Sequence, residues 1–172
     1  MSETHEKIIS SYPQVLFVAL IILCRVFRVS YLYVVGFGAN FVANCGLKLF
    51  FRRVMGSAGN RPVPYETHDA IQTAVCSAVP FLDGAIRSAN AYGFPSGHAQ
   101  TVGYFLAFAH RVLPWRTWHP AWVVAALLAA AWLMWTRVAF QRHTPVQVLF
   151  GFAFGVAVFQ AVHQAVRLPL TA

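Results

Sequence analysis

Three polar segments interrupt the long apolar runs of this sequence, and each carries residues that could do chemistry. They are Asn60–Pro64, Phe94–Gln100 and Thr136–Gln147. The second contains His98 and the third contains His143. Because a histidine side chain changes charge near neutral pH, it can act as a general acid, a general base or a nucleophile. These two histidines are therefore the first candidates for catalytic residues.

The residues around the two histidines favour an anionic ligand. Arg61 and Arg137 could each place two N–H groups on the oxygens of a phosphate. A helix beginning near Ser96 would point free backbone N–H groups outward, and Gly97 would let a ligand approach that backbone closely. Arginines, a helix N-terminus and two histidines together indicate phosphoryl transfer.

The composition predicts the kind of protein that positions these residues. Of the 172 residues, 58% are hydrophobic and 10% charged, whereas soluble domains carry about 25% charged residues. We therefore expect one membrane domain over residues 1–172, with the motifs between residues 48 and 147. The formal net charge of +8 suits an anionic membrane surface or a phosphorylated substrate. The basic residues are scattered between apolar runs, which argues against nucleic acid as a partner.

Five apolar runs predict membrane-spanning helices, which need about 20 mostly apolar residues. They cover approximately residues 13–27, 30–51, 96–113, 120–140 and 145–168. Between the second and third runs, helical spacing over Glu66–Asn90 predicts a helical segment at the membrane surface. The expected fold is an all-α, polytopic transmembrane helical bundle of about five spans, because helices satisfy every backbone group in lipid.

The alternation of these spans places the three polar segments on one face of the membrane. Arg61 follows the second span, His98 opens the third, and Arg137 and His143 flank the junction of the fourth and fifth. Short loops and ends on the opposite face carry more cations, namely Arg25, Arg28, Arg111, Arg116 and Arg167. The positive-inside rule then predicts a site on the lumenal or extracytoplasmic face, of the endoplasmic reticulum or a bacterial inner membrane.

The three segments resemble the motifs of the type 2 phosphatidic acid phosphatase superfamily, K-x6-R-P, P-S-G-H and S-R-x5-H-x3-D. Pro95–His98 matches the second motif in full. Arg137 and His143 have the spacing of the third, in which Thr136 replaces Ser and Gln147 replaces Asp. The resemblance extends over more than half of the chain and implies a membrane phosphatase.

The first motif is altered in this chain. Arg61-Pro62 matches its end, but Val54 occupies the position of the family's Lys. The cation that would complete the phosphate site is then Lys48, Arg52 or Arg53.

The resemblance implies a role for each matching residue. His143 would attack phosphorus and carry a phosphohistidine intermediate, and His98 would protonate the leaving oxygen. The phosphate oxygens would be held by Arg61, Arg137, Ser96, the N–H of Gly97 and one of the three alternative cations. The resemblance implies no metal and no other cofactor.

Gln147 has two interpretations. The family's Asp orients the nucleophilic histidine, and the amide oxygen of Gln147 could still do so without the charge. Thr144–Gln147 is also a capping box with Pro145 at the first helical position, so Gln147 could simply cap the fifth span. Because glutamine has both an acceptor and donors, the two roles are compatible.

The substrate is expected to be a lipid phosphate or diphosphate in the membrane. The sequence His-Thr-x-x-Gln-Val and the residue Gln100 resemble the dolichyldiphosphatase branch, which implies a polyisoprenyl diphosphate. Phosphatidic acid or a related lipid monophosphate is the alternative substrate. A degenerate member that binds lipid phosphate without catalysis is a third interpretation, motivated by the altered first motif and Gln147. No oligomeric state is predicted.

Overall fold

The computed structural model describes residues 11–62, 84, 88–89, 91–113 and 119–167. Its α-helices are α2 (Tyr12–Val26), α3 (Leu32–Met55), α6 (Gly97–Val112), α7 (Pro120–Ala139) and α8 (Pro145–Arg167). A short 3-10 helix, η1 (Gly56–Gly59), follows α3, and the described ranges contain no strand beyond an isolated bridge between Asn60 and Tyr92. These helices confirm the all-α prediction. The predicted surface helix over Glu66–Asn90 lies almost wholly outside the described residues.

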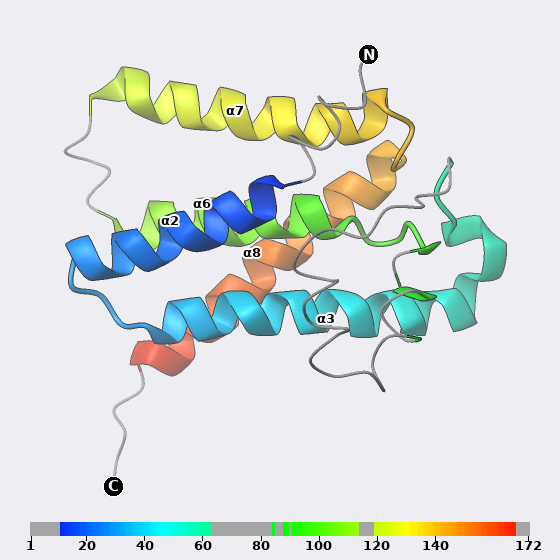
Figure 1. The fold of residues 1–172 in the computed structure, drawn as a ribbon, viewed down its shortest axis with the longest axis horizontal. Helices are drawn as coiled ribbons and strands as arrows, with labels where there is room; N and C mark the ends of the chain where they lie inside the picture. Colours follow the sequence, from blue (N-terminus) through cyan, green and yellow to red (C-terminus); the bar gives the residue numbers. More distant parts are fainter. Residues whose placement is uncertain (1–10, 63–83, 85–87, 90, 114–118, 168–172) are drawn as a thin grey trace, which may run out of the picture.

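Helix α6 lies inside the bundle, and its closest neighbour is α8 (Figure 1). The two backbones approach closely because α8 has glycines where it contacts the backbone of α6. A Cβ atom on Gly151 would lie 2.4 Å from the carbonyl oxygen of Ser96, and one on Gly155 would lie 1.9 Å from that of Gln100. Since real Cβ atoms do not approach so near, glycine at both positions permits the contact. This contact fixes the start of α6 against the start of α8.

Among the described residues, three helices are long and apolar enough to cross a membrane: Leu32–Gly59, Pro120–Ala139 and Pro145–Arg167. Of the other two predicted spans, α2 is a shorter apolar helix of 15 residues and α6 has 16. Helix α6 also buries Gln100 and Thr101. A helix enclosed by other helices contacts protein in place of lipid, so it can be shorter and more polar than a lipid-facing span.

Helix α7 forms one side of the bundle (Figure 1). Its tryptophans Trp122, Trp132 and Trp135 are each more than half exposed. Such an apolar surface is expected on a helix that faces lipid.

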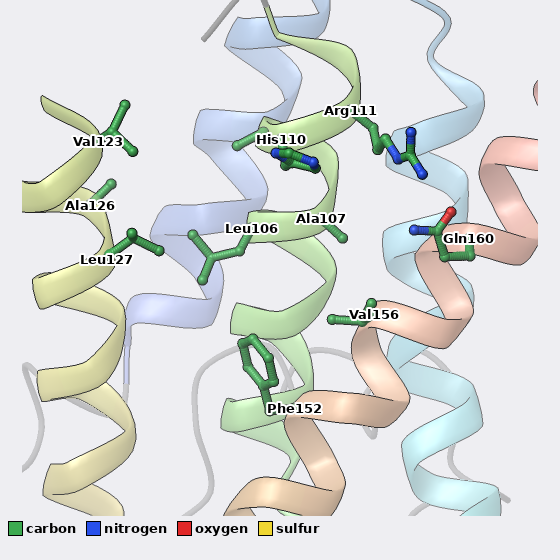
Figure 2. A pocket seen from close by; sticks show the side chains of 11 residues that line it. Leu106, Ala107, His110, Arg111, Val123, Ala126, Leu127, Phe152, Val156 and Gln160 are labelled. Carbon is green, nitrogen blue, oxygen red and sulfur yellow. The ribbon is translucent and has the colours of Figure 1, made fainter. Parts of the chain in front are cut away.

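An apolar cavity of about 310 Å³ lies between α6, α7 and α8 (Figure 2). Leu106, Leu127, Phe152 and Val156 line it, and His110 near the C-terminal end of α6 stands at its edge. The two candidate catalytic histidines do not line this cavity. This apolar cavity is therefore separate from the polar segments that carry the two histidines.

Candidate active site

His143 lies in the turn between α7 and α8 and is 1% exposed. Its Nδ1 atom is 2.9 Å from the carbonyl oxygen of Gly93 and 3.3 Å from Oε1 of Gln147. Because both partners are acceptors, Nδ1 carries the proton and Nε2 keeps its lone pair. Nη1 of Arg61 donates to that Nε2 at 3.1 Å. The ring is thus fixed in the tautomer that a nucleophile requires, with Nε2 facing a cation.

Three cationic side chains lie close enough to His143 for their charges to act on it: Lys48, Arg61 and Arg137. Lys48 is 4% exposed and Arg137 is 1% exposed. All five acidic residues of the chain fall outside the described ranges. Burial first, and then the charges of these cations and of His98, hold the pKa of His143 well below its usual range. His143 is therefore neutral at pH 7, and the cluster presents its positive charge to an anion.

The turn after α7 brings Arg137 and His143 together. Helix α7 ends at Ala139, and the N–H groups of Arg142 and His143 both donate to the carbonyl oxygen of Arg137 at 3.0 Å. Gln141 adopts a left-handed backbone with φ of 53° within this turn. Pro145 then begins α8, where its lack of an N–H costs no hydrogen bond. The spacing of the third motif thus corresponds to one compact turn.

Lys48, one of the three alternatives for the third cation, lies at the site. Helix α3 continues past Lys48 to Met55, and η1 then reverses the chain so that Arg61 returns to the cluster. The reversal is held by Gly59, whose carbonyl oxygen accepts from the N–H groups of Gly93 and Phe94, each at 3.1 Å. The longer spacing between Lys48 and Arg61 is therefore absorbed by extra helix and a return loop.

Arg52 and Arg53, the other two alternatives, are exposed. Nη1 of Arg52 donates to the hydroxyl of Ser88. Arg52, Asn60, Arg61 and Ser88 border a cavity of about 300 Å³ beside the site. Lys48 is buried and its charge acts on His143, whereas Arg52 and Arg53 lie at the surface, so Lys48 is the alternative that the structure places within the cluster.

The Pro-Ser-Gly-His motif begins α6. Ser96 is fully buried and caps the helix, accepting weakly from the N–H of Ala99 at 3.5 Å. The N–H of Ser96 donates to the carbonyl oxygen of Gln147 at 3.0 Å, which ties α6 to α8. Gly97 is the first residue of α6, and a Cβ there would lie 2.9 Å from Oδ1 of Asn44. The start of α6 therefore abuts α3 one turn before Lys48.

His98 is half-buried at the second position of α6. Its ring contacts that of Tyr12 edge-on, with centroids 5.3 Å apart and planes at 69°. It also lies near enough to His143 for the two rings to interact electrostatically. The structure thus places both histidines at one end of the bundle, where α3 and α7 end and α6 and α8 begin (Figure 1).

Gln147 connects three parts of the site. Its Oε1 accepts from the N–H of Thr144 at 3.0 Å, and its own N–H donates to Oγ1 of Thr144 at 3.3 Å, which is a complete capping box. Its Nε2 donates to the carbonyl oxygens of Gly59 and Asn60 at 3.2 and 3.0 Å. Gln147 therefore has the geometry of both interpretations, because it caps α8 and also contacts the ring of His143.

A buried amide network holds α3 against α6 beneath the site. Nε2 of Gln100 donates to the backbone oxygen and to Oδ1 of Asn40 at 2.7 and 2.8 Å. Oε1 of Gln100 accepts from Nδ2 of Asn44 at 2.7 Å. All three side chains are at most 6% exposed. Because these bonds are short and shielded from water, they fix the register of the helices that carry Lys48 and His98.

The carbonyl of Gly93 and the side chain of Tyr12 also contact the candidate catalytic histidines, and the sequence did not predict either contact. The carbonyl of Gly93 makes the shorter contact with Nδ1 of His143, but a backbone acceptor has no residue-type signature. Gly93 itself is close-packed, since a Cβ there would lie 2.9 Å from the amide of Gln147. Tyr12, in the first turn of α2, lies far along the chain from the three motifs, so their spacing gave no signal for it.

The chain belongs to the PAP2 superfamily, because the sequence profile of that family matches residues 28–169. Two curated relatives are each named lipid A 1-phosphatase. The one from Rhizobium etli is 34% identical over 125 residues, covering 72% of this chain and 48% of the relative. The one from Rhizobium johnstonii is 44% identical over 63 residues, covering 36% of this chain and 23% of the relative.

The chain thus spans about half the length of the Rhizobium etli relative and less of the other. No solved structure matches the chain. The region that matches the family includes both histidine motifs and Lys48, whereas α2 lies outside this region.

Proposed function

We propose that this protein is an integral membrane lipid phosphatase that works through a phosphohistidine at His143. One observation carries the proposal. A neutral, buried His143 directs Nε2 into a cluster of cations formed by Lys48, Arg61 and Arg137. A cluster of three cations of this kind suits a phosphate dianion, and the neutral imidazole supplies the nucleophile.

The proposed reaction has two steps. Nε2 of His143 attacks phosphorus, the bond from phosphorus to the leaving oxygen breaks, and His98 delivers a proton to that oxygen. Water then attacks the phosphohistidine with His98 as general base, which releases inorganic phosphate and regenerates His143. Positioning and charge stabilisation supply most of the catalysis in phosphoryl transfer, which is the part assigned to the three cations.

The N-terminus of α6 supplies further donors in this proposal. Gly97 is its first residue, so the N–H of Gly97 is one of the helix groups without an intrahelical partner. Oγ of Ser96 accepts from the N–H of Ala99 as the helix cap, and we propose that the Ser96 hydroxyl donates its proton in a hydrogen bond to a phosphate oxygen. With three cations and these donors, the reaction is proposed to need no metal.

The substrate is proposed to be a lipid whose phosphate lies at the membrane interface. The curated relatives favour a lipid A 1-phosphate, after their printed names. The His-Thr-x-x-Gln-Val sequence favours a polyisoprenyl diphosphate, and phosphatidic acid is the simplest lipid monophosphate for comparison. The site is proposed to face the lumenal or extracytoplasmic side, on the charge asymmetry of the loops.

The test is phosphate release by the detergent-purified protein in the presence of EDTA. Lipid A, polyprenyl diphosphate and phosphatidic acid are compared, with His143→Ala as the matched inactive variant. Release from one of the lipids that is insensitive to EDTA and lost in His143→Ala is the expected result. Binding of these lipids without release above the His143→Ala background would replace the proposal with the non-catalytic interpretation.

A further inference from the structure

Tyr12 carries a buried hydroxyl at the edge of the site. The residue is the first of α2 and is 7% exposed. Its hydroxyl oxygen is inaccessible and has no hydrogen-bond partner within the part of the chain that the structure describes. A buried hydroxyl is nearly always hydrogen-bonded, because leaving it unsatisfied costs free energy. An exception beside a candidate active site therefore indicates a partner that arrives with the ligand.

Packing fixes the direction of the Tyr12 side chain. Its ring lies in an apolar cluster with Val102 of α6 and Ala130 of α7, and it contacts the ring of His98 edge-on at 5.3 Å. The charge of Arg137 acts on its hydroxyl group. The hydroxyl thus lies in the same region as the proposed general acid and a proposed phosphate-binding arginine.

We infer that Tyr12 is a substrate-binding residue whose hydroxyl donates a hydrogen bond to a phosphate oxygen held near Arg137 and His98. The inference rests on the proposed function for the identity of the reaction, but it concerns the binding of any phosphate at this site. The phenol keeps its proton at neutral pH and acts only as a donor. Tyr12 lies outside residues 28–169, so this contact is supplied by a helix beyond the family's matched region.

The inference predicts a loss of activity without a loss of stability when the hydroxyl is removed. Tyr12→Phe keeps the ring against His98 and removes only the hydroxyl. Loss of one hydrogen bond to a charged ligand lowers kcat/KM and phosphate affinity on the order of 10- to 100-fold. In the free protein the same change removes an unsatisfied polar group, so the Tm stays the same or rises.

Tyr33→Phe is the matched control. The hydroxyl of Tyr33 is 2.8 Å from Nδ1 of His163. Tyr33 is in the first turn of α3 and His163 is near the end of α8, at the end of the bundle opposite the start of α8 (Figure 1). Removing the Tyr33 hydroxyl breaks an existing hydrogen bond, so the Tm falls while kcat/KM of the folded protein is unchanged. The two variants therefore distinguish a hydroxyl that makes its hydrogen bond only with bound ligand from a hydroxyl whose hydrogen bond stabilises the fold.

The experiment measures kcat/KM on the active lipid, the affinity for inorganic phosphate by titration calorimetry, and the Tm. Wild-type phosphate affinity and kcat/KM in Tyr12→Phe would overturn the inference, as would a loss of activity that only follows a lowered Tm. If the wild type turns over lipid and Tyr12→Phe has the same kcat/KM and phosphate affinity, the inference is refuted and the proposed function stands. Phosphate binding that depends on Tyr12 in a protein without turnover supports the inference and refutes the proposed function alone.

Discussion

Replacing Lys48 by methionine should reduce activity and raise stability at the same time. Lys48 is 4% exposed and its charge acts on His143 together with those of Arg61 and Arg137. A phosphate bound as proposed would compensate these charges, whereas in the free protein the three cations lie close to one another. Methionine has a similar length and no charge, so Lys48→Met removes the ammonium with little change in packing.

The size of each effect can be estimated separately. Loss of one preorganised group that stabilises transition-state charge typically lowers kcat by about 10²–10³. Removing a buried like charge and its desolvation should stabilise the free protein by about 1–2 kcal/mol, within the range of other stabilising substitutions. For a chain of this size, each 1 kcal/mol corresponds to about 2–4 °C, so the Tm should rise by about 2–8 °C.

The assay compares phosphate release and thermal unfolding for wild type, Lys48→Met and Arg53→Met. Arg53→Met is the matched control because Arg53 is exposed on the same helix and does not line the cavity beside the site. It should change kcat and the Tm little. A Lys48→Met variant with wild-type kcat, or with a lowered Tm, would refute the assignment of Lys48 as the third phosphate-binding cation.

Three further predictions concern the groups around the site. Because the pKa of His143 is held well below its usual range, protonation of His143 should lower kcat/KM only under acidic conditions, well below pH 7. The unfolded chain takes up that proton first, so the Tm should also decline as pH falls below about 6.5. Gln147→Glu places a negative charge beside the ring, so the pKa of His143 should rise and the acid limb of the pH profile should move toward neutral pH, and an unmoved limb would exclude the contact seen at Nδ1. Gln100→Leu removes three hydrogen bonds and leaves the amide of Asn44 without its partner. At about 0.6 kcal/mol for each bond, the protein should be destabilised by about 2 kcal/mol in thermal unfolding. An unchanged Tm would contradict the network.

The sequence was sufficient to predict the described α-helices and the end of the bundle at which the motifs meet. The apolar runs are bounded by signals that act locally, such as Pro120 and Pro145 at helix starts and Ser96 as a cap, so the observed helices begin close to the predicted positions. The alternation of spans requires no side-chain detail. It places His98 and His143 at one end, and the structure does the same.

The third cation could not be chosen from spacing, because residues between Lys48 and Arg61 can lie in a helix or in a loop. Helix α3 takes up most of them, so Lys48 lies within the cluster and Arg53 is exposed. Tyr12 and the carbonyl of Gly93 were inaccessible to motif reasoning for other reasons. Tyr12 reaches the site only through the packing of α2 on α6, and a backbone carbonyl is available at every position.

The replacement of the family's Asp by Gln147 changes the charge of the site more than its geometry. Nδ1 of His143 has an acceptor in the carbonyl of Gly93, so the ring keeps its tautomer without a carboxylate. The amide of Gln147 also donates to the carbonyls of Gly59 and Asn60, which a carboxylate could not do. A carboxylate here would neutralise part of the cation cluster and raise the pKa of His143. In the proposed mechanism, glutamine leaves the charge of the cations to act on phosphate and keeps His143 neutral. The phosphohistidine intermediate then lacks the negative charge that a carboxylate would place beside its ring. We therefore expect tight phosphate binding, with breakdown of the phosphohistidine as the step that Gln147→Glu alters most.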